Sequence, residues 1–170
     1  MIPLEIERKF LIRQSTELFD NCSEKTDIVQ TYLVRPDPSL QRRVRSMTTN
    51  GTAKYFYTEK RFLSASTREE NEREISCEEY EALLGEADRE LVPIIKTRHI
   101  LIYKSQRFEI DCYPFSDSLA SMELELSDEH QVIYFPPFAD IIKEVTGDKR
   151  YSNAALAKNG CFPDEEQQPK

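Results

Sequence analysis

The stretch of residues 4–12 alternates between apolar and charged side chains, and this alternation constrains the fold most strongly. Glu5, Glu7 and Lys9 occupy one phase, whereas the other phase is apolar apart from Arg8. Because successive side chains of a β-strand point to opposite faces, Glu5, Glu7 and Lys9 would share one face of a strand. A strand with one face in water shows the same pattern, so this stretch alone predicts a strand but no site.

Further strands are expected along most of the chain, separated by short turns. The dipeptide Asn50-Gly51 is a strong hairpin signal, and the prolines at 36 and 38 end another strand. The expected strands cover about residues 3–13, 27–35, 40–48, 53–62, 68–76, 92–104, 106–115 and 122–126. Short helices are expected at about 16–19, 78–87, 138–145 and 152–158. The sequence therefore predicts a β-dominated α+β fold, with an eight-stranded antiparallel sheet closed into a barrel and a few short helices.

Length, charge and cysteine usage exclude several classes of protein. With 170 residues and 39% apolar content, the chain suits one domain, expected over residues 1–160 and followed by a mobile tail at 161–170. No apolar run is long enough for a membrane helix, and no secretory signal is visible. The net charge of −8 disfavours nucleic acid and anionic membranes as partners. Four dispersed cysteines indicate reduced thiols, and hence a cytoplasmic protein.

Charged residues two positions apart recur, but a chain with 32% charged residues produces many such pairs by chance. The residues between them are more informative. Apolar residues alternate with acids around Glu109 and Asp111 and around Glu123 and Glu125, whereas the alternation at residues 70–72 is less regular. A closed barrel could place the charged face inside, or it could place the apolar face inside, as in a lipocalin-like container.

A barrel with its charged face inside would enclose both carboxylates and cations. Crowded carboxylates oppose folding, and a hard cation such as Mg²⁺ or Mn²⁺ would relieve their repulsion through oxygen ligands. Arginine and lysine side chains suit a polyanion such as a polyphosphate. A divalent metal beside a basic cluster is the arrangement that phosphoryl transfer needs. The cations are Lys9, Arg43, Arg45, Lys60, Lys96 and Arg98.

An ordered set of short motifs resembles the CYTH family, also called triphosphate tunnel metalloenzymes. Residues 5–9 are similar to its ExExK signature, and the terminal segment 144–153 is similar to its E-V-T-x-D-x-R-Y-x-N pattern. Two positions depart from the family, because Thr31 stands where glycine is usual and His99 replaces a common tyrosine. The remaining matches are Gln30-Thr31-Tyr32-Leu33, Arg43-Val44-Arg45, Thr58-Glu59-Lys60, residues 68–75, Lys96-Thr97-Arg98, Glu109-Ile110-Asp111 and Glu123-Leu124-Glu125.

The resemblance implies an eight-stranded antiparallel tunnel with charged residues inside, and a divalent-metal-dependent enzyme that acts on triphosphates. It implies that the metal, Mg²⁺ or Mn²⁺, is held by Glu5, Glu7, Glu123 and Glu125, with Asp111 nearby. It implies that the phosphates are bound by Lys9, Arg43, Arg45, Lys60 and Arg98. A Lys96–Tyr32 pair would activate water, and Glu70 and Glu72 would assist a second metal or the attacking water. Arg8 is expected to point outward and to be replaceable.

The substrate that these residues favour is inorganic tripolyphosphate, a small polyanion that needs nothing beyond the tunnel. Adenylyl cyclases of the family carry a His-Phe stretch after the second strand, and this chain has no histidine there. The chain also has no tryptophan to hold a thiamine group, and its net charge argues against RNA. A non-enzymatic module that binds phosphorylated metabolites is the alternative from another class. The oligomeric state stays open, with a homodimer as the candidate assembly.

Overall fold

The computed structural model describes residues 6–63 and 68–165. The chain divides into two compact units, which are described separately. Unit 1 contains the residues up to Thr26 together with Lys96 and all that follows, and unit 2 contains Asp27–Ile95. Glu5, one of the predicted metal ligands, lies outside the described residues, as do the first residues of the predicted strand at 3–13.

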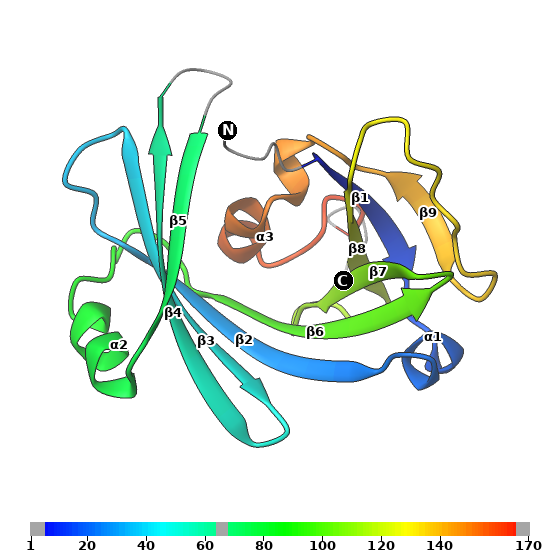
Figure 1. Ribbon diagram of the computed structural model, residues 1–170, viewed down its shortest axis with the longest axis horizontal. Helices are drawn as coiled ribbons and strands as arrows, with labels where there is room; N and C mark the ends of the chain where they lie inside the picture. The colour runs from blue at the N-terminus through cyan, green and yellow to red at the C-terminus, as the bar shows by residue number, and fades with distance from the viewer. Residues whose placement is uncertain (1–5, 64–67, 166–170) are drawn as a thin grey trace. The chain divides into compact units, whose positions relative to one another are not determined.

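Unit 1 is built on five antiparallel strands in the order β6-β7-β8-β1-β9 (Figure 1). Its helices are short. The short helix η1 and helix α3 follow the last strand, and Ser152 caps α3 by accepting a hydrogen bond from the backbone N–H of Ala155. The elements are β1 (Ile6–Arg13), α1 (Thr16–Asp20), β6 (Ile94–Tyr103, which begins in unit 2), β7 (Gln106–Cys112), β8 (Leu119–Leu126), β9 (Asp140–Glu144), η1 (Lys149–Tyr151) and α3 (Asn153–Asn159).

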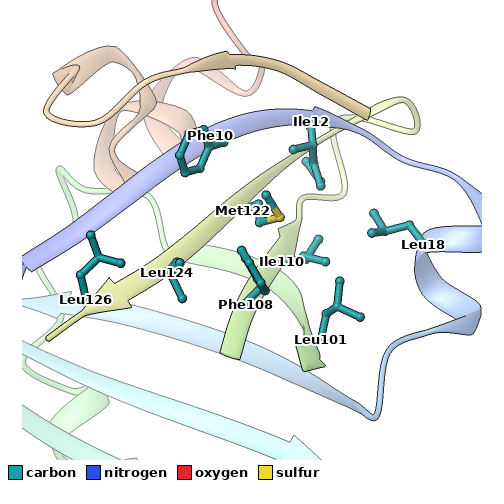
Figure 2. Packing of buried hydrophobic residues seen from close by; sticks show 10 residues of the cluster. Phe10, Ile12, Leu18, Leu101, Phe108, Ile110, Met122, Leu124 and Leu126 are labelled. Atoms are coloured by element: carbon teal, nitrogen blue, oxygen red, sulfur yellow. The ribbon is translucent and has the colours of Figure 1, made fainter. Parts of the chain in front are cut away.

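One face of the unit 1 sheet forms a hydrophobic core (Figure 2). Met122 of β8 lies opposite Phe10 of β1 on one side and Ile110 of β7 on the other. Phe108 and Leu124 are paired in the same way, and all five side chains are buried. Because side chains alternate along each strand, this register sends the intervening charged residues to the opposite face.

Unit 2 holds four antiparallel strands in the order β2-β3-β4-β5, with helix α2 packed against β3 and β4. Asn50 and Gly51 join β3 to β4 with φ angles of 50° and 77°, which confirms the predicted hairpin turn. Leu33, Val44, Ile75 and Tyr80 form the core of this unit. The elements are β2 (Glu24–Leu33, which begins in unit 1), β3 (Leu40–Thr49), β4 (Thr52–Phe62), β5 (Arg68–Ile75) and α2 (Cys77–Leu84).

The β-dominated antiparallel architecture is confirmed, but barrel closure is not. Within the described residues the strand order is open in both units. The helix predicted at 138–145 is wrong, because residues 140–144 form strand β9 along the edge of β1. No helix in the described part of the chain is long and apolar enough to cross a bilayer.

The start of the predicted tail is packed into unit 1. Phe162 is completely buried and contacts the rings of Tyr113, Phe115 and Tyr151. The domain boundary at residue 160 stays a prediction.

Candidate functional site

The polar face of unit 1 collects most of the charged residues that the sequence singled out. Across β1 and β8, Glu7 lies opposite Glu125 and Lys9 lies opposite Glu123. Glu109 of β7 lies on the other side of Glu123. In the same phase, Asp111 of β7 lies opposite Arg98 of β6. The antiparallel register therefore brings residues from four separate stretches of sequence onto one face.

A cavity of about 420 Å³ opens on this face and is lined by four carboxylates, those of Glu7, Glu109, Glu123 and Glu125. Oxygen donors of this kind suit Mg²⁺ or Mn²⁺. No three histidine, cysteine or acidic side chains converge into a ready metal site among the residues that the structure describes. Because Mg²⁺ keeps several waters and takes only one or two carboxylates beside substrate phosphates, this donor set still fits the metal.

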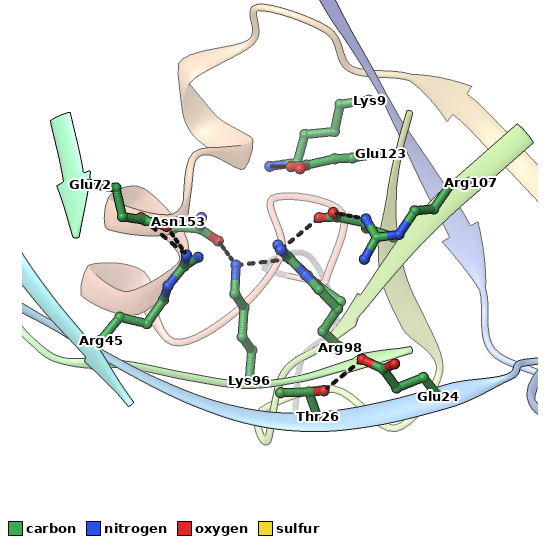
Figure 3. Close-up of polar contacts among 12 residues, drawn as sticks. Lys9, Glu24, Thr26, Arg45, Glu72, Lys96, Arg98, Arg107, Glu123 and Asn153 are labelled. Atoms are coloured by element: carbon green, nitrogen blue, oxygen red, sulfur yellow. Dashed lines mark hydrogen bonds and ion pairs between the residues drawn. The ribbon is translucent and has the colours of Figure 1, made fainter. Parts of the chain in front are cut away.

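The amine of Lys9 contacts two oxygen atoms on this face. Its Nζ lies 3.2 Å from a carboxylate oxygen of Glu123 and donates to the backbone carbonyl of Tyr151 at 2.8 Å. Figure 3 shows the Lys9 and Glu123 side chains directed toward each other. The carbonyl belongs to η1, so the segment before α3 is attached to the same face.

Lys96, Arg98 and Asp111 form a buried ion-pair network on the same face. Lys96 Nζ donates to Asp111 Oδ2 at 2.8 Å, and Arg98 donates to both oxygens of Asp111 at 2.8 and 2.9 Å. Lys96 is 3% exposed and Asp111 is 1% exposed. Both carboxylate oxygens of Asp111 are thus engaged by cations, Oδ2 by two donors and Oδ1 by one.

Burial and neighbouring charges shift the pKa values of this network. Burial alone would raise the pKa of Asp111, but Lys96 and Arg98 outweigh it and hold that pKa well below its usual range. The pKa of Lys96 is lowered, chiefly by burial, with Arg98 adding to the effect and Asp111 opposing it. The carboxylate therefore stays ionised, whereas the amine gives up its proton more readily than an exposed lysine.

Asn153 and Tyr113 extend the hydrogen-bond network of Lys96. The charge pattern along the strands did not predict either residue. Asn153 Oδ1 accepts hydrogen bonds from Lys96 Nζ at 3.4 Å and from the Tyr113 hydroxyl at 2.5 Å. Figure 3 shows Asn153 reaching Lys96 from α3. Strand periodicity could not find a helical asparagine, and the only sequence signal was its place at the end of the terminal motif.

Unit 2 presents a second polar face, in which every predicted cation is matched with an acid. Arg43 and Lys60 lie 3.5 and 3.4 Å from Glu70, and Arg45 lies 3.3 Å from Glu72. Glu72 also accepts from the Thr58 hydroxyl at 2.8 Å. The Arg43 Nε is buried and has no hydrogen-bond partner within the described residues.

Tyr32 and Arg8, two further residues singled out from the sequence, each have a hydrogen-bonded partner. Tyr32 lies on β2 in unit 2, where its hydroxyl accepts from the Gln30 amide at 3.3 Å. Arg8 binds Glu144 of β9 through two hydrogen bonds of 2.7 and 2.9 Å, with both side chains partly exposed. Arg8 thus joins β1 and β9, and it lies opposite Leu124 of β8, in the strand phase opposite to that of Glu7 and Lys9, as the sequence indicated.

Comparison with known proteins identifies the family. The family model of the CYTH domain matches residues 3–149. The chain belongs to the CYTH family. An inorganic triphosphatase of Nitrosomonas europaea is 34% identical to this CYTH chain over 155 residues, which cover 90% of the chain and 96% of the relative.

Solved structures agree with the CYTH assignment. A crystal structure of an inorganic triphosphatase is similar with a TM-score of 0.62 and 31% identity, covering 92% of this chain and 95% of the other. A protein of Pyrococcus horikoshii OT3 is similar with a TM-score of 0.52, covering 73% of this chain and 80% of the other. At 20% identity, the second likeness supports the fold alone.

Proposed function

We propose that this CYTH protein hydrolyses a triphosphate with the help of Mg²⁺ or Mn²⁺, and that its substrate is inorganic tripolyphosphate, cleaved to diphosphate and phosphate. The observation that carries the proposal is the polar face of unit 1, where a cavity is lined by four carboxylates and one of them, Glu123, is paired with the partly buried Lys9. The 34% identity to an inorganic triphosphatase supports the same substrate. The closed tunnel implied by the family resemblance is part of this proposal, as is a cytoplasmic location.

The metal would be held by Glu7, Glu123 and Glu125, with Glu5 as a further ligand and Asp111 as a neighbour. When bound, it would neutralise charge on the phosphate oxygens and on the leaving diphosphate. Its preference for oxygen ligands is met by this donor set.

The phosphate groups would be bound by the five cations that the family resemblance implies, Lys9, Arg43, Arg45, Lys60 and Arg98. Arg43, Arg45 and Lys60 would exchange their carboxylate partners for phosphate oxygens, which offer the same kind of acceptor with more charge. Lys9 and Arg98 would do the same on the face of unit 1. Such fixed cations stabilise the charge that develops as the terminal phosphoryl group is transferred.

Lys96 is our candidate base for the attacking water, with Tyr32 as its partner. Burial lowers the pKa of Lys96, which makes the neutral amine more accessible near neutral pH. Glu70 and Glu72, which pair with the substrate-binding cations, would orient the water or support a second metal.

The test is release of phosphate from tripolyphosphate, ATP and thiamine triphosphate, each with Mg²⁺, with Mn²⁺ and with a chelator. We expect rapid release from tripolyphosphate with either metal, and a loss of about 100-fold or more in Glu125→Gln, since an electrostatic contribution to catalysis is of this size. The exposed Glu90 gives a control variant, Glu90→Gln, which should keep full activity. Formation of cyclic AMP and diphosphate from ATP, or binding without turnover, would overturn the proposal.

A further inference from the structure

We propose that Asn153, at the start of α3, is a positioning residue that aims the amine of Lys96 at the reacting water. The proposal rests on the proposed function, because it assumes that Lys96 acts in triphosphate hydrolysis. It extends the site to the C-terminal helix, which the charge pattern of the strands did not include.

The hydrogen bonds fix the orientation of the Asn153 amide. Its Oδ1 meets two donors, Lys96 Nζ and the Tyr113 hydroxyl. Burial raises the pKa of Tyr113, so the phenol stays protonated and remains a donor. The opposite orientation of the amide would bring its NH₂ group against the Lys96 amine, which has no acceptor when charged. Tyr113 therefore holds the Asn153 oxygen toward Lys96.

Two fixed acceptors determine the remaining direction on the Lys96 nitrogen. Asp111 accepts at 2.8 Å and Asn153 at 3.4 Å, and Lys96 is almost completely buried. A tetrahedral nitrogen held by its Cε and by two acceptors has a single direction left, whether that position carries a proton or a lone pair. Without Asn153, the amine could rotate about its bond to Asp111, and this direction would no longer be defined.

Asp111 is the charge partner of Lys96. The contribution of Asn153 is therefore to orient the Lys96 amine more than to hold it in place. The longer of the two contacts is the one to Asn153, which makes it a weak anchor but still a geometric constraint. Misplacement of a reacting group by about 1 Å can lower a rate by about 100-fold. Loss of Asn153 should therefore lower kcat and leave substrate binding nearly unchanged.

The experiment compares Asn153→Ala with Leu156→Ala in tripolyphosphate hydrolysis. Leu156 is completely buried in the same helix and has an apolar side chain that cannot hydrogen-bond to Lys96, so its variant reports damage to the packing of α3. We expect Asn153→Ala to lower kcat by about 10- to 100-fold with KM within about 3-fold. Leu156→Ala should keep the wild-type kcat per folded molecule, although it unfolds at a lower temperature. Equal loss of kcat in both variants, or full kcat in Asn153→Ala, would refute the role of Asn153.

Two further measurements distinguish a positioning role of Asn153 from a purely structural one. Tyr113→Phe removes the donor that orients the amide, so it should lower kcat less than Asn153→Ala and add little to it in the double variant. The NMR signal of the Lys96 side chain should shift in Asn153→Ala and stay in place in Leu156→Ala. This signal does not depend on turnover. A wild-type protein that leaves tripolyphosphate intact would refute the proposed function, whereas an unshifted Lys96 signal would refute the contact itself.

Discussion

At the scale of single residues, Asp111 is the position on which the charged network depends. It is 1% exposed and accepts hydrogen bonds from the buried Lys96 and from the partly buried Arg98. A buried ion pair contributes little net stability when intact, but removal of one partner leaves a charge without compensation in a medium of low dielectric constant. The cost of breaking the network is therefore larger than the stabilisation that it provides.

We predict that Asp111→Asn lowers the free energy of unfolding by about 3 to 5 kcal/mol at neutral pH. The pKa of Asp111 in the folded protein lies below its unfolded value of about 4. Its contribution to stability is thus complete above about pH 4 and is lost as the pH falls through the lower folded value. Urea unfolding at several pH values should show this acid loss in the wild type and a smaller one in Asp111→Asn. Equal stability of the two proteins at pH 7 would refute the argument.

Arg8, a charged residue of β1, gives the opposite expectation. Its pair with Glu144 is more than one-third exposed on both sides, so solvent screens it. Arg8→Gln should lower stability by less than about 1 kcal/mol and leave tripolyphosphate hydrolysis within about 2-fold of the wild type. Glu144→Gln should give the same result, since it removes the same pair. A large loss of activity in Arg8→Gln alone would show that the residue has a role in the site.

At the scale of elements, the hairpin between β3 and β4 sets the register of the cations on unit 2. Gly51 has a φ of +77°, and no atom lies within 4 Å of the position of an added Cβ. Gly51→Ala should thus cost only the backbone strain, about 1 to 2 kcal/mol, with no steric clash. Asn50→Gly, at the neighbouring left-handed position, should be nearly neutral. Thermal unfolding would measure both, and an unchanged midpoint for Gly51→Ala would contradict the expectation.

The strands could be predicted where one face is apolar and the other charged, as in β1, β7 and β8. Strand β9 could not, because Phe138, Ile141 and Val145 have the spacing of a helix. Residues 140–144 instead supply backbone hydrogen bonds to the edge of β1, a tertiary requirement that local spacing does not encode. The same limit applies to the site. Strand phase grouped Glu7, Lys9 and Glu123, but the contact between Asn153 and Lys96 depends on how α3 packs.

At the scale of the whole molecule, the C-terminal segment is part of unit 1. Phe162 is completely buried against three aromatic rings, and η1 and α3, which precede it, hold Lys9 and Lys96. Phe162→Ala should lower the free energy of unfolding by about 3 to 5 kcal/mol, because it leaves a cavity. Val132→Ala, at an exposed apolar position, should change it by less than about 0.5 kcal/mol. Guanidinium unfolding would measure both, and equal stability would show that the segment is dispensable.

The pairing of acids across β1, β7 and β8 has a consequence for how long the protein survives in a cell. Glu7 lies opposite Glu125, and like charges in such positions oppose the folded state. A cation bound only by the folded chain would reverse this, adding about 2.7 kcal/mol at 100 times its dissociation constant. Digestion by a protease should accordingly be slower with Mg²⁺ than with a chelator, and Glu125→Gln should reduce that difference. Metal supply would then determine the abundance of the protein as well as its rate.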